Sequence, residues 1–160
     1  MSFTYAIALG SNRRHGRHGA PAGVLRAAIA TLEAEGLRVT AVSPILATPA
    51  LGPAGRAFAN AALLAETPLD PPALLALLKR TERSFGRRPG RRWGPRVLDL
   101  DIILWSGGAF RSRRLSIPHR ETARRAFVLT PLASIAPRWR LGSGNVTQAL
   151  ARLDRARPRS

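Results

Sequence analysis

The sequence predicts an α+β fold, a ferredoxin-like α/β sandwich with an antiparallel sheet and helices packed on it. Three observations support this prediction. Segments with strand and helix patterns follow one another in the order β-α-β-β-α-β, with additions after them. The chain has 160 residues, which suits one compact domain. Apolar residues make up 45% of it, enough to build a core. We therefore expect residues 1–160 to form a single domain, with a basic tail from about residue 154.

Hydrophobic periodicity and turn residues place the elements along the chain. We expect strands over residues 4–9, 37–46, 58–65, 97–105 and 115–117. We expect helices over residues 21–35, 71–86, 121–133 and 146–153. Asp70 can cap the second helix, and Pro71 and Pro72 suit its first turn. Pro131 should interrupt the third helix, and the alanine-rich third strand could also pass for a helix.

Composition excludes several classes of protein. No run of about 18 apolar residues occurs, so no membrane span is expected. The first residues lack a basic segment followed by a long apolar one, so they indicate a strand and not a signal peptide. The absence of cysteine excludes disulfides and thiolate metal sites. These features predict a cytoplasmic protein.

The formal net charge of +17 at pH 7 leaves two interpretations open. Apart from Lys79, every residue in the lysine and arginine count is arginine, a bias that a GC-rich genome can produce. The alternative is a surface that meets polyanions such as nucleoside triphosphates or nucleic acid. A basic RNA-binding module is the main rival function. Its K/R-G-F/Y-G/A-F-V-x-F/Y consensus is absent, so nucleic acid is not expected as a partner.

Two aspartates stand two residues apart inside an apolar strand, in Asp99-Leu100-Asp101. Strand residues two apart face the same side, with Cα atoms about 6–7 Å apart, so these carboxylates can converge on one site. Their mutual repulsion is costly unless a cation neutralises them. Mg²⁺ suits such a site because it binds through one or two carboxylates together with substrate phosphates. The alternative is that both side chains face water or pair with arginine.

The segment before this strand is basic and rich in glycine and proline, from Gly86-Arg87-Arg88 to Arg91-Arg92-Trp93-Gly94-Pro95-Arg96. Arginine binds phosphate oxygens through paired hydrogen bonds, and metal ions with arginines recur in phosphoryl transfer. The segment could close over the site as a lid, or it could be a solvated basic loop. His119 could donate to a phosphate, although a lone histidine is more often structural. A Walker-type site is excluded because G-x-x-x-x-G-K-[ST] is absent.

Together these motifs resemble the 6-hydroxymethyl-7,8-dihydropterin pyrophosphokinase family over nearly the whole chain, from Ala8 to Pro137. The most specific block is Arg92-Trp93-Gly94-Pro95-Arg96-Val97-Leu98-Asp99-Leu100-Asp101-Ile102. Further motifs support it: Thr48-Pro49-Ala50-Leu51-Gly52-Pro53, Phe58-Ala59-Asn60-Ala61-Ala62, Ile117-Pro118-His119 and Arg125-Ala126-Phe127-Val128-Leu129. Arg120 follows His119 where the family often has proline or tyrosine.

The resemblance implies a ferredoxin-like fold and a reaction in which the pterin hydroxyl attacks the β-phosphorus of ATP and AMP leaves. It implies two Mg²⁺ ions held by Asp99 and Asp101, with Arg87 and Arg96 acting on the triphosphate. Around ATP it places Lys79, Glu82, Arg92, Arg114, His119 and Arg125. Around the pterin it places Thr48, Pro49, Leu51, Phe58, Asn60, Trp93 and Phe127.

Within that implied pterin pocket, Phe58 and Phe127 sandwich the heterocycle and Asn60 reads its polar edge. Trp93 matches a lid residue that closes over the site. A flat polar heterocycle suits aromatic faces with a few fixed hydrogen bonds. We expect a monomer whose partners are its small-molecule substrates, ATP and 6-hydroxymethyl-7,8-dihydropterin.

Overall fold

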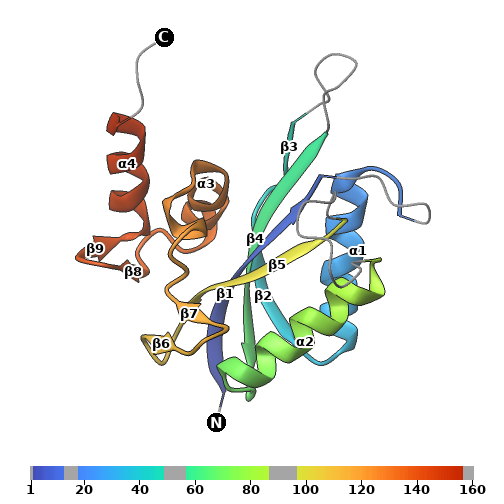
Figure 1. Ribbon diagram of the computed structural model, residues 1–160. Coiled ribbons are helices and arrows are strands. Elements are labelled where there is room, and N and C mark those ends of the chain that lie inside the picture. The colour runs from blue at the N-terminus through green and yellow to red at the C-terminus, as the bar shows by residue number, and fades with distance from the viewer. Residues whose placement is uncertain (1, 13–17, 49–56, 87–96, 157–160) are drawn as a thin grey trace.

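The computed structural model describes residues 2–12, 18–48, 57–86 and 97–156. Within these residues, five strands form one antiparallel sheet (Figure 1). They are β1 (Phe3–Ser11), β2 (Arg38–Val42), β3 (Leu46–Thr48), β4 (Phe58–Thr67) and β5 (Asp99–Trp105). The order across the sheet is β2-β4-β1-β5, and β3 pairs with β4. The sequence thus predicted the α+β class and the antiparallel sheet correctly.

Helices cover both faces of this sheet (Figure 1). On one face lie α1 (Pro21–Ala34) and α2 (Pro71–Ser84); on the other lies α3 (Ala126–Ile135), and α4 (Val146–Ala156) packs against α3. The first core, beneath α1 and α2, contains large side chains such as Tyr5, Ile7, Leu9, Leu25, Leu63, Leu74, Leu78 and Leu100. The second core, beneath α3 and α4, contains Ala6, Ala8, Ala62, Ile103, Leu104, Val128, Leu129, Leu132 and Val146.

The central strand β1 contributes side chains of different size to the two faces. Successive strand residues point to opposite faces, so Ile7 and Leu9 enter the first core while Ala6 and Ala8 face the second. Ala62 on β4 also faces the second core. The second face of the sheet is therefore lined by small residues beside β5, so few side-chain atoms project from it there.

The start of α2 follows the capping rules that its sequence suggests. The Asp70 side chain accepts a hydrogen bond from the Ala73 N–H at 3.0 Å, and Pro71 occupies the first helical position. The Tyr5 hydroxyl donates to the Leu69 carbonyl at 2.7 Å and ties β1 to this cap. Burial, and to a smaller extent the Asp70 carboxylate, raises the pKa of Tyr5 to about 12, so the phenol remains a donor.

The single strand expected over residues 37–46 is two strands, β2 and β3, separated at Ser43. Ser43 is buried, and its N–H donates to the Ala62 carbonyl at 2.9 Å. Its Oγ accepts the Ala62 N–H, also at 2.9 Å, in place of a main-chain carbonyl. A side chain thus replaces one ladder bond, and Pro44 follows directly without an N–H to offer. The strand can therefore break at this point while the main-chain groups of Ala62 on β4 keep their hydrogen-bond partners.

We expect Ser43→Ala to lower the free energy of unfolding by about 1–3 kcal/mol, because the buried Ala62 N–H loses its acceptor. Urea denaturation followed by circular dichroism measures the change. Ser84→Ala is the matched control, since Ser84 is exposed and its hydroxyl only donates to the Thr81 carbonyl. Equal, small decreases in the free energy of unfolding of both variants would contradict the role assigned to Ser43.

The third helix begins later than the sequence predicts. A 3₁₀ turn, η1 (Thr122–Arg124), comes first, and Arg125 is extended before α3 starts. The expected interruption at Pro131 is wrong, because α3 continues through it. Pro131 removes the N–H that would reach the Phe127 carbonyl in the first turn. Its neighbour Leu132 is fully buried in the second core, and this packing outweighs the lost bond.

Short hairpins complete the described chain. β6 (Phe110–Arg111) pairs with β7 (Ser116–Ile117), and β8 (Arg140–Leu141) pairs with β9 (Gly144–Asn145). The sequence predicted β7 but not its partner, and it did not predict the second hairpin. The last helix, α4, continues past the expected end at residue 153 to Ala156. Among the residues that the structure describes, no helix has the length and apolar character needed to cross a membrane.

Candidate active site

The two aspartates of β5 lie on the face of the sheet opposite the first core. Leu98, Leu100 and Ile102 are buried in the first core, so strand alternation turns Asp99 and Asp101 to the second face. Both aspartates are partly exposed, and the Asp101 side chain keeps 39% of its surface. Two carboxylates on adjacent same-face positions of one strand can bind the same ligand, as their spacing predicts.

Each aspartate of this pair ends a row of residues that runs across β4, β1 and β5. In one row Gly10 of β1 lies between Asn60 of β4 and Asp99 of β5. In the next row Ala8 pairs with both Ala62 and Asp101. A Cβ atom built on Gly10 would lie 3.2 Å from the Asn60 Oδ1 atom, so that amide lies over the glycine. The structure therefore places Asn60 and Asp99 on either side of Gly10, in one row across β4, β1 and β5.

We expect Gly10→Ala to weaken binding of the pterin by roughly threefold to tenfold, because the added methyl group displaces the Asn60 amide by a few tenths of an ångström. Its effect on ATP binding should be smaller. Calorimetric titration of both ligands measures the two affinities. Gly107→Ala is not a suitable control, because its Cβ would strike the Trp105 ring. Ser106→Ala is the control, since Ser106 is exposed and follows the end of β5 that is away from Asp99. Unchanged pterin affinity in Gly10→Ala would contradict a contact between the Asn60 amide and the pterin.

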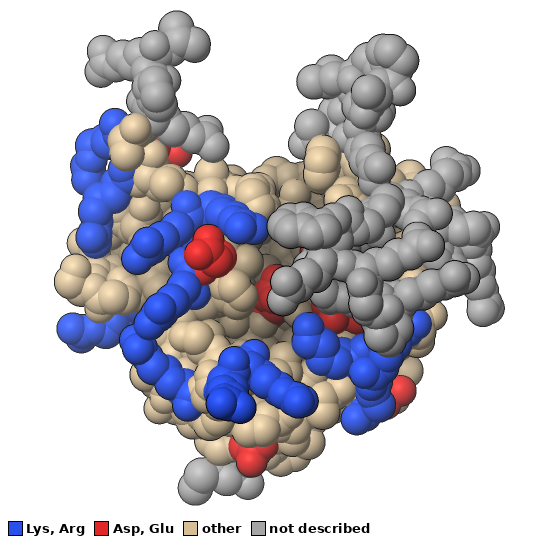
Figure 2. Space-filling view, viewed as in Figure 1, with Lys and Arg blue, Asp and Glu red and all other residues tan. Residues whose placement is uncertain are grey.

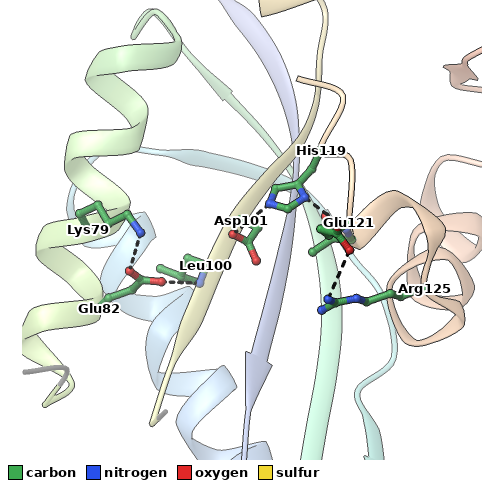
Figure 3. Close-up of polar contacts among 8 residues, drawn as sticks. Lys79, Glu82, Leu100, Asp101, His119, Glu121 and Arg125 are labelled. Atoms are coloured by element: carbon green, nitrogen blue, oxygen red, sulfur yellow. Dashed lines mark hydrogen bonds and ion pairs between the residues drawn. The ribbon is translucent and has the colours of Figure 1, made fainter. Parts of the chain in front are cut away.

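His119 follows β7, and its side chain points toward Asp101 (Figure 3). Its main-chain N–H donates to the Ile103 carbonyl at 3.2 Å, which fixes the residue beside β5. Its Nδ1 atom accepts the Thr122 N–H at 3.2 Å. A neutral imidazole that accepts at Nδ1 carries its proton on Nε2. That Nε2 atom lies 3.7 Å from the Asp101 Oδ1 atom, so it points a donor toward the site.

A cavity of about 160 Å³ lies between α2, β5 and the segment around β7. It brings together four of the residues that the resemblance implies: Lys79, Asp101, Arg114 and His119. Apolar side chains complete much of its lining: Leu75, Leu100, Ile102 and Leu115. Arg120 also lines it, next to His119. The sequence did not single out Leu75 or Leu115, because an apolar residue beside a ligand has the same pattern as one in the core.

Basic side chains gather around the small cavity at the free edge of β5. Figure 2 shows lysine and arginine around the acidic side chains in the middle of the view. A wider groove of about 900 Å³ runs along α2 and shares Lys79 and Arg114 with the smaller cavity. It adds Arg80, Arg83 and Arg113, and no carboxylate lines it among the described residues. The approach to the cavity is therefore positive, as suits a polyphosphate ligand.

Glu82 lies deeper than the other charged residues implied for the ATP side. Its side chain is 2% exposed, and Oε2 accepts the Leu100 N–H at 2.9 Å (Figure 3). Its Oε1 atom lies 3.5 Å from the Lys79 Nζ atom. Lys79 is about half exposed and bridges this buried carboxylate to the cavity.

The two aromatic residues that the resemblance implies for the pterin pocket remain exposed. Phe58 on β4 and Phe127 on α3 each keep 45% of their surface, unusually high for such side chains. Phe58 precedes Asn60 by two residues on the same strand face, and Thr48 pairs with Phe58 in the sheet. The Arg125 guanidinium lies 5.7 Å from the centre of the Phe127 ring, and its Nη2 atom lies 3.8 Å from a Glu121 oxygen. Arg125 does not line the small cavity.

Six residues implied for the site lie outside the described residues: Pro49, Leu51, Arg87, Arg92, Trp93 and Arg96. Their roles, and that of the basic loop as a lid, stay predictions.

The donor set of the aspartate pair fits a hard cation. In the described ranges, no group of three or more histidine, aspartate or glutamate side chains gathers to hold a metal ion. Two carboxylates alone do not complete an octahedral shell, so substrate phosphates and water must supply the rest. That division of ligands is the usual one for Mg²⁺ in enzymes that use nucleotides. The residues present therefore fit Mg²⁺ bound together with substrate and not a closed protein cage.

Paired carboxylates beside basic side chains, on an edge strand of an antiparallel sheet, suit an enzyme that transfers phosphoryl groups. Residues 6–137 match the model of the 7,8-dihydro-6-hydroxymethylpterin-pyrophosphokinase family. A 2-amino-4-hydroxy-6-hydroxymethyldihydropteridine pyrophosphokinase of Methylorubrum extorquens is 42% identical over 150 residues, 92% of each chain. Its counterpart in Pseudomonas aeruginosa is 41% identical over 140 residues, 86% of this chain and 83% of the relative. A mitochondrial folate synthesis bifunctional protein of Pisum sativum is 37% identical over 130 residues, 81% of this chain and 24% of the relative.

The chain belongs to the 7,8-dihydro-6-hydroxymethylpterin-pyrophosphokinase family. It is an ATP-dependent pyrophosphokinase that transfers pyrophosphate to hydroxymethyldihydropterin in folate biosynthesis. The resemblance found in the sequence is therefore confirmed, and so is the activity that it implies.

Proposed function

We propose that the transfer takes place on the second face of the sheet, where Asp99 and Asp101 meet Asn60 across Gly10. The pterin hydroxyl attacks the β-phosphorus of ATP, the bond from that phosphorus to the oxygen bridging the α-phosphate breaks, and AMP leaves. The hydroxyl proton is released as the new phosphate ester forms. One observation carries this assignment: the register of β1 with β4 and β5 sets the pterin-side amide beside the acidic pair.

Asp99 and Asp101 would hold two Mg²⁺ ions, together with phosphate oxygens of ATP. When bound, Mg²⁺ lowers the pKa of a coordinated hydroxyl and offsets negative charge on phosphoryl oxygens. The carboxylates orient the two substrates because each lies at a fixed position on one strand. No covalent intermediate on the protein is needed.

The residues of the small cavity bind ATP in this proposal. Leu75 and Leu115 provide apolar surfaces for the flat base, and Lys79 and Arg114 supply positive charge at its edge. His119 donates from Nε2 to a phosphate oxygen, because Nδ1 is occupied as an acceptor. Arg87 and Arg96 act on the triphosphate, and Arg92 binds ATP, as the resemblance implies.

The pterin stacks between Phe58 and Phe127, while Asn60 reads its polar edge. The exposure of both rings and the position of Asn60 over Gly10 support this assignment. Thr48, Pro49, Leu51 and Trp93 complete the pocket, as the family resemblance implies.

We also propose that the fold is ferredoxin-like. The order β2-β4-β1-β5 with α1 and α2 on one face supports this, and α3 with α4 forms an additional layer on the other. The single-domain organisation and the monomeric state stay predictions.

Release of AMP from ATP, with and without the reduced hydroxymethylpterin, tests the proposed site directly. We expect AMP and pterin pyrophosphate to form in equal amounts, only when both substrates and Mg²⁺ are present. Chelation of Mg²⁺ should abolish the reaction and restoring it should recover the rate. Turnover that persists in excess chelator would contradict the metal assignment to the aspartate pair.

A further inference from the structure

Glu82 is the only aspartate or glutamate that is buried in the described part of the chain. A buried carboxylate is unfavourable unless its oxygens find strong partners. Its partners in the described part of the chain include the Leu100 N–H at 2.9 Å and the Lys79 ammonium group at 3.5 Å. One of these partners belongs to the strand that carries the aspartate pair.

β5 is the outermost strand of the sheet, next to β1 on one side only. Main-chain groups of successive strand residues point to alternate edges. Because the Leu100 N–H donates to Glu82, it points away from β1, toward the edge that faces α2. The carboxylate thus occupies the position that a further strand would occupy. Its bond fixes the peptide plane that joins Asp99 to Leu100, which lies between the two aspartates.

A second contact holds the same edge further along. The His119 N–H donates to the Ile103 carbonyl at 3.2 Å, two residues beyond Asp101. The free edge of β5 is therefore held at two points: at Leu100, between the aspartates, by a side chain of α2, and at Ile103, beyond them, by the main chain after β7. An edge strand without such contacts can twist or shift, and its side chains move with it.

We infer that Glu82 is a positioning residue for Asp99 and Asp101, which acts through the Leu100 main chain and not by touching ATP. This inference rests on the proposed metal role of the two aspartates. It differs from the ATP contact that the family resemblance implies for Glu82. It also explains why a charge lies in the interior, since a carboxylate accepts a stronger hydrogen bond than a neutral group.

Glu82→Leu and Glu82→Gln separate positioning from direct contact. Leucine has similar bulk but accepts no hydrogen bond, whereas glutamine keeps an acceptor oxygen. With ATP saturating, we expect Glu82→Leu to raise the Mg²⁺ concentration for half-maximal rate by about 10- to 100-fold, the usual effect of losing a group that orients a metal ligand. In Glu82→Gln, the Mg²⁺ concentration for half-maximal rate should stay within a few-fold of its value in the unmodified protein. Glu66→Leu is the matched control, since Glu66 pairs with Arg38 at the end of β4 that is away from Asn60 and the aspartates.

Several outcomes would overturn this inference. A higher ATP requirement in Glu82→Leu with an unchanged Mg²⁺ requirement would make Glu82 a direct ATP contact. If Glu82→Leu and Glu82→Gln raise the Mg²⁺ requirement equally, the charge of Glu82 and not its hydrogen bond to Leu100 causes the effect. Asp101→Asn serves as a separate reference: if it leaves the Mg²⁺ requirement unchanged, the proposed metal site fails whatever Glu82 does.

Amide hydrogen exchange tests the same inference without activity or metal. In the unmodified protein without Mg²⁺, we expect the Leu100 amide to exchange slowly although β5 is an edge strand, and to exchange faster in Glu82→Gln because the neutral acceptor is weaker. Exchange of the Leu100 amide at the rate of an exposed loop amide would overturn the inference, even if Glu82→Leu does not fold.

Discussion

Asp101→Asn and Asp99→Asn are each expected to lower the rate of AMP release by about 10²–10³-fold, the size typical of losing one group that orients reactants or stabilises the transition state. Asparagine keeps the volume of the side chain and one oxygen, but it removes the charge that attracts a cation. Both aspartates are partly exposed, so their replacement should leave the fold intact. Initial rates over a wide range of Mg²⁺ concentration measure the effect.

Asp70→Asn is the matched control for these variants. Asp70 caps α2 away from the pair, and asparagine caps helices about as well as aspartate. Its rate should therefore match that of the unmodified enzyme. If both Asp99→Asn and Asp101→Asn keep near-full activity at moderate Mg²⁺, the carboxylates do not hold the metal.

Phe127→Ala is expected to weaken pterin binding by about 1–3 kcal/mol, or roughly 5- to 150-fold in Kd, because one aromatic face of the site is lost. Phe127 is 45% exposed, so its truncation costs the fold less than loss of a core ring. ATP affinity should change little. Calorimetric titration with each substrate separately gives both affinities.

Two further variants sharpen this experiment. Phe127→Leu keeps bulk without a flat face, so it should recover only part of the lost affinity. Val42→Ala truncates another exposed apolar residue, at 43% exposure on β2, and should leave both affinities unchanged. Equal losses for ATP and pterin in Phe127→Ala would indicate general loss of structure and not loss of stacking.

Local patterns in the sequence were enough for the scaffold and for the acidic pair. Asp70 and Pro71 define the start of α2 by capping chemistry, which acts over a few residues. The alternation around Asp99 and Asp101 gives their shared face, because strand periodicity is also local. Register is not local: only the structure pairs Gly10 with both Asn60 and Asp99.

The errors arise where distant contacts override local preference. The strand over residues 37–46 breaks at Ser43 because its hydroxyl binds the Ala62 N–H, and Ala62 is remote in the sequence. Likewise α3 passes through Pro131 because the second core holds its neighbours. The burial of Glu82 depends on the Leu100 N–H at the edge of β5, which no pattern within α2 reveals.

The position of β1 between β4 and β5 also bears on how this enzyme forms. Asn60 and the two aspartates come from separate parts of the chain, and they meet only when β1 has paired with both neighbours. Such pairings join residues far apart in the sequence, and they form slowly because long loops must close first. A partly folded chain can hold its helices and one hairpin and still lack a substrate site. The enzyme therefore becomes active only when β1 has paired with both β4 and β5.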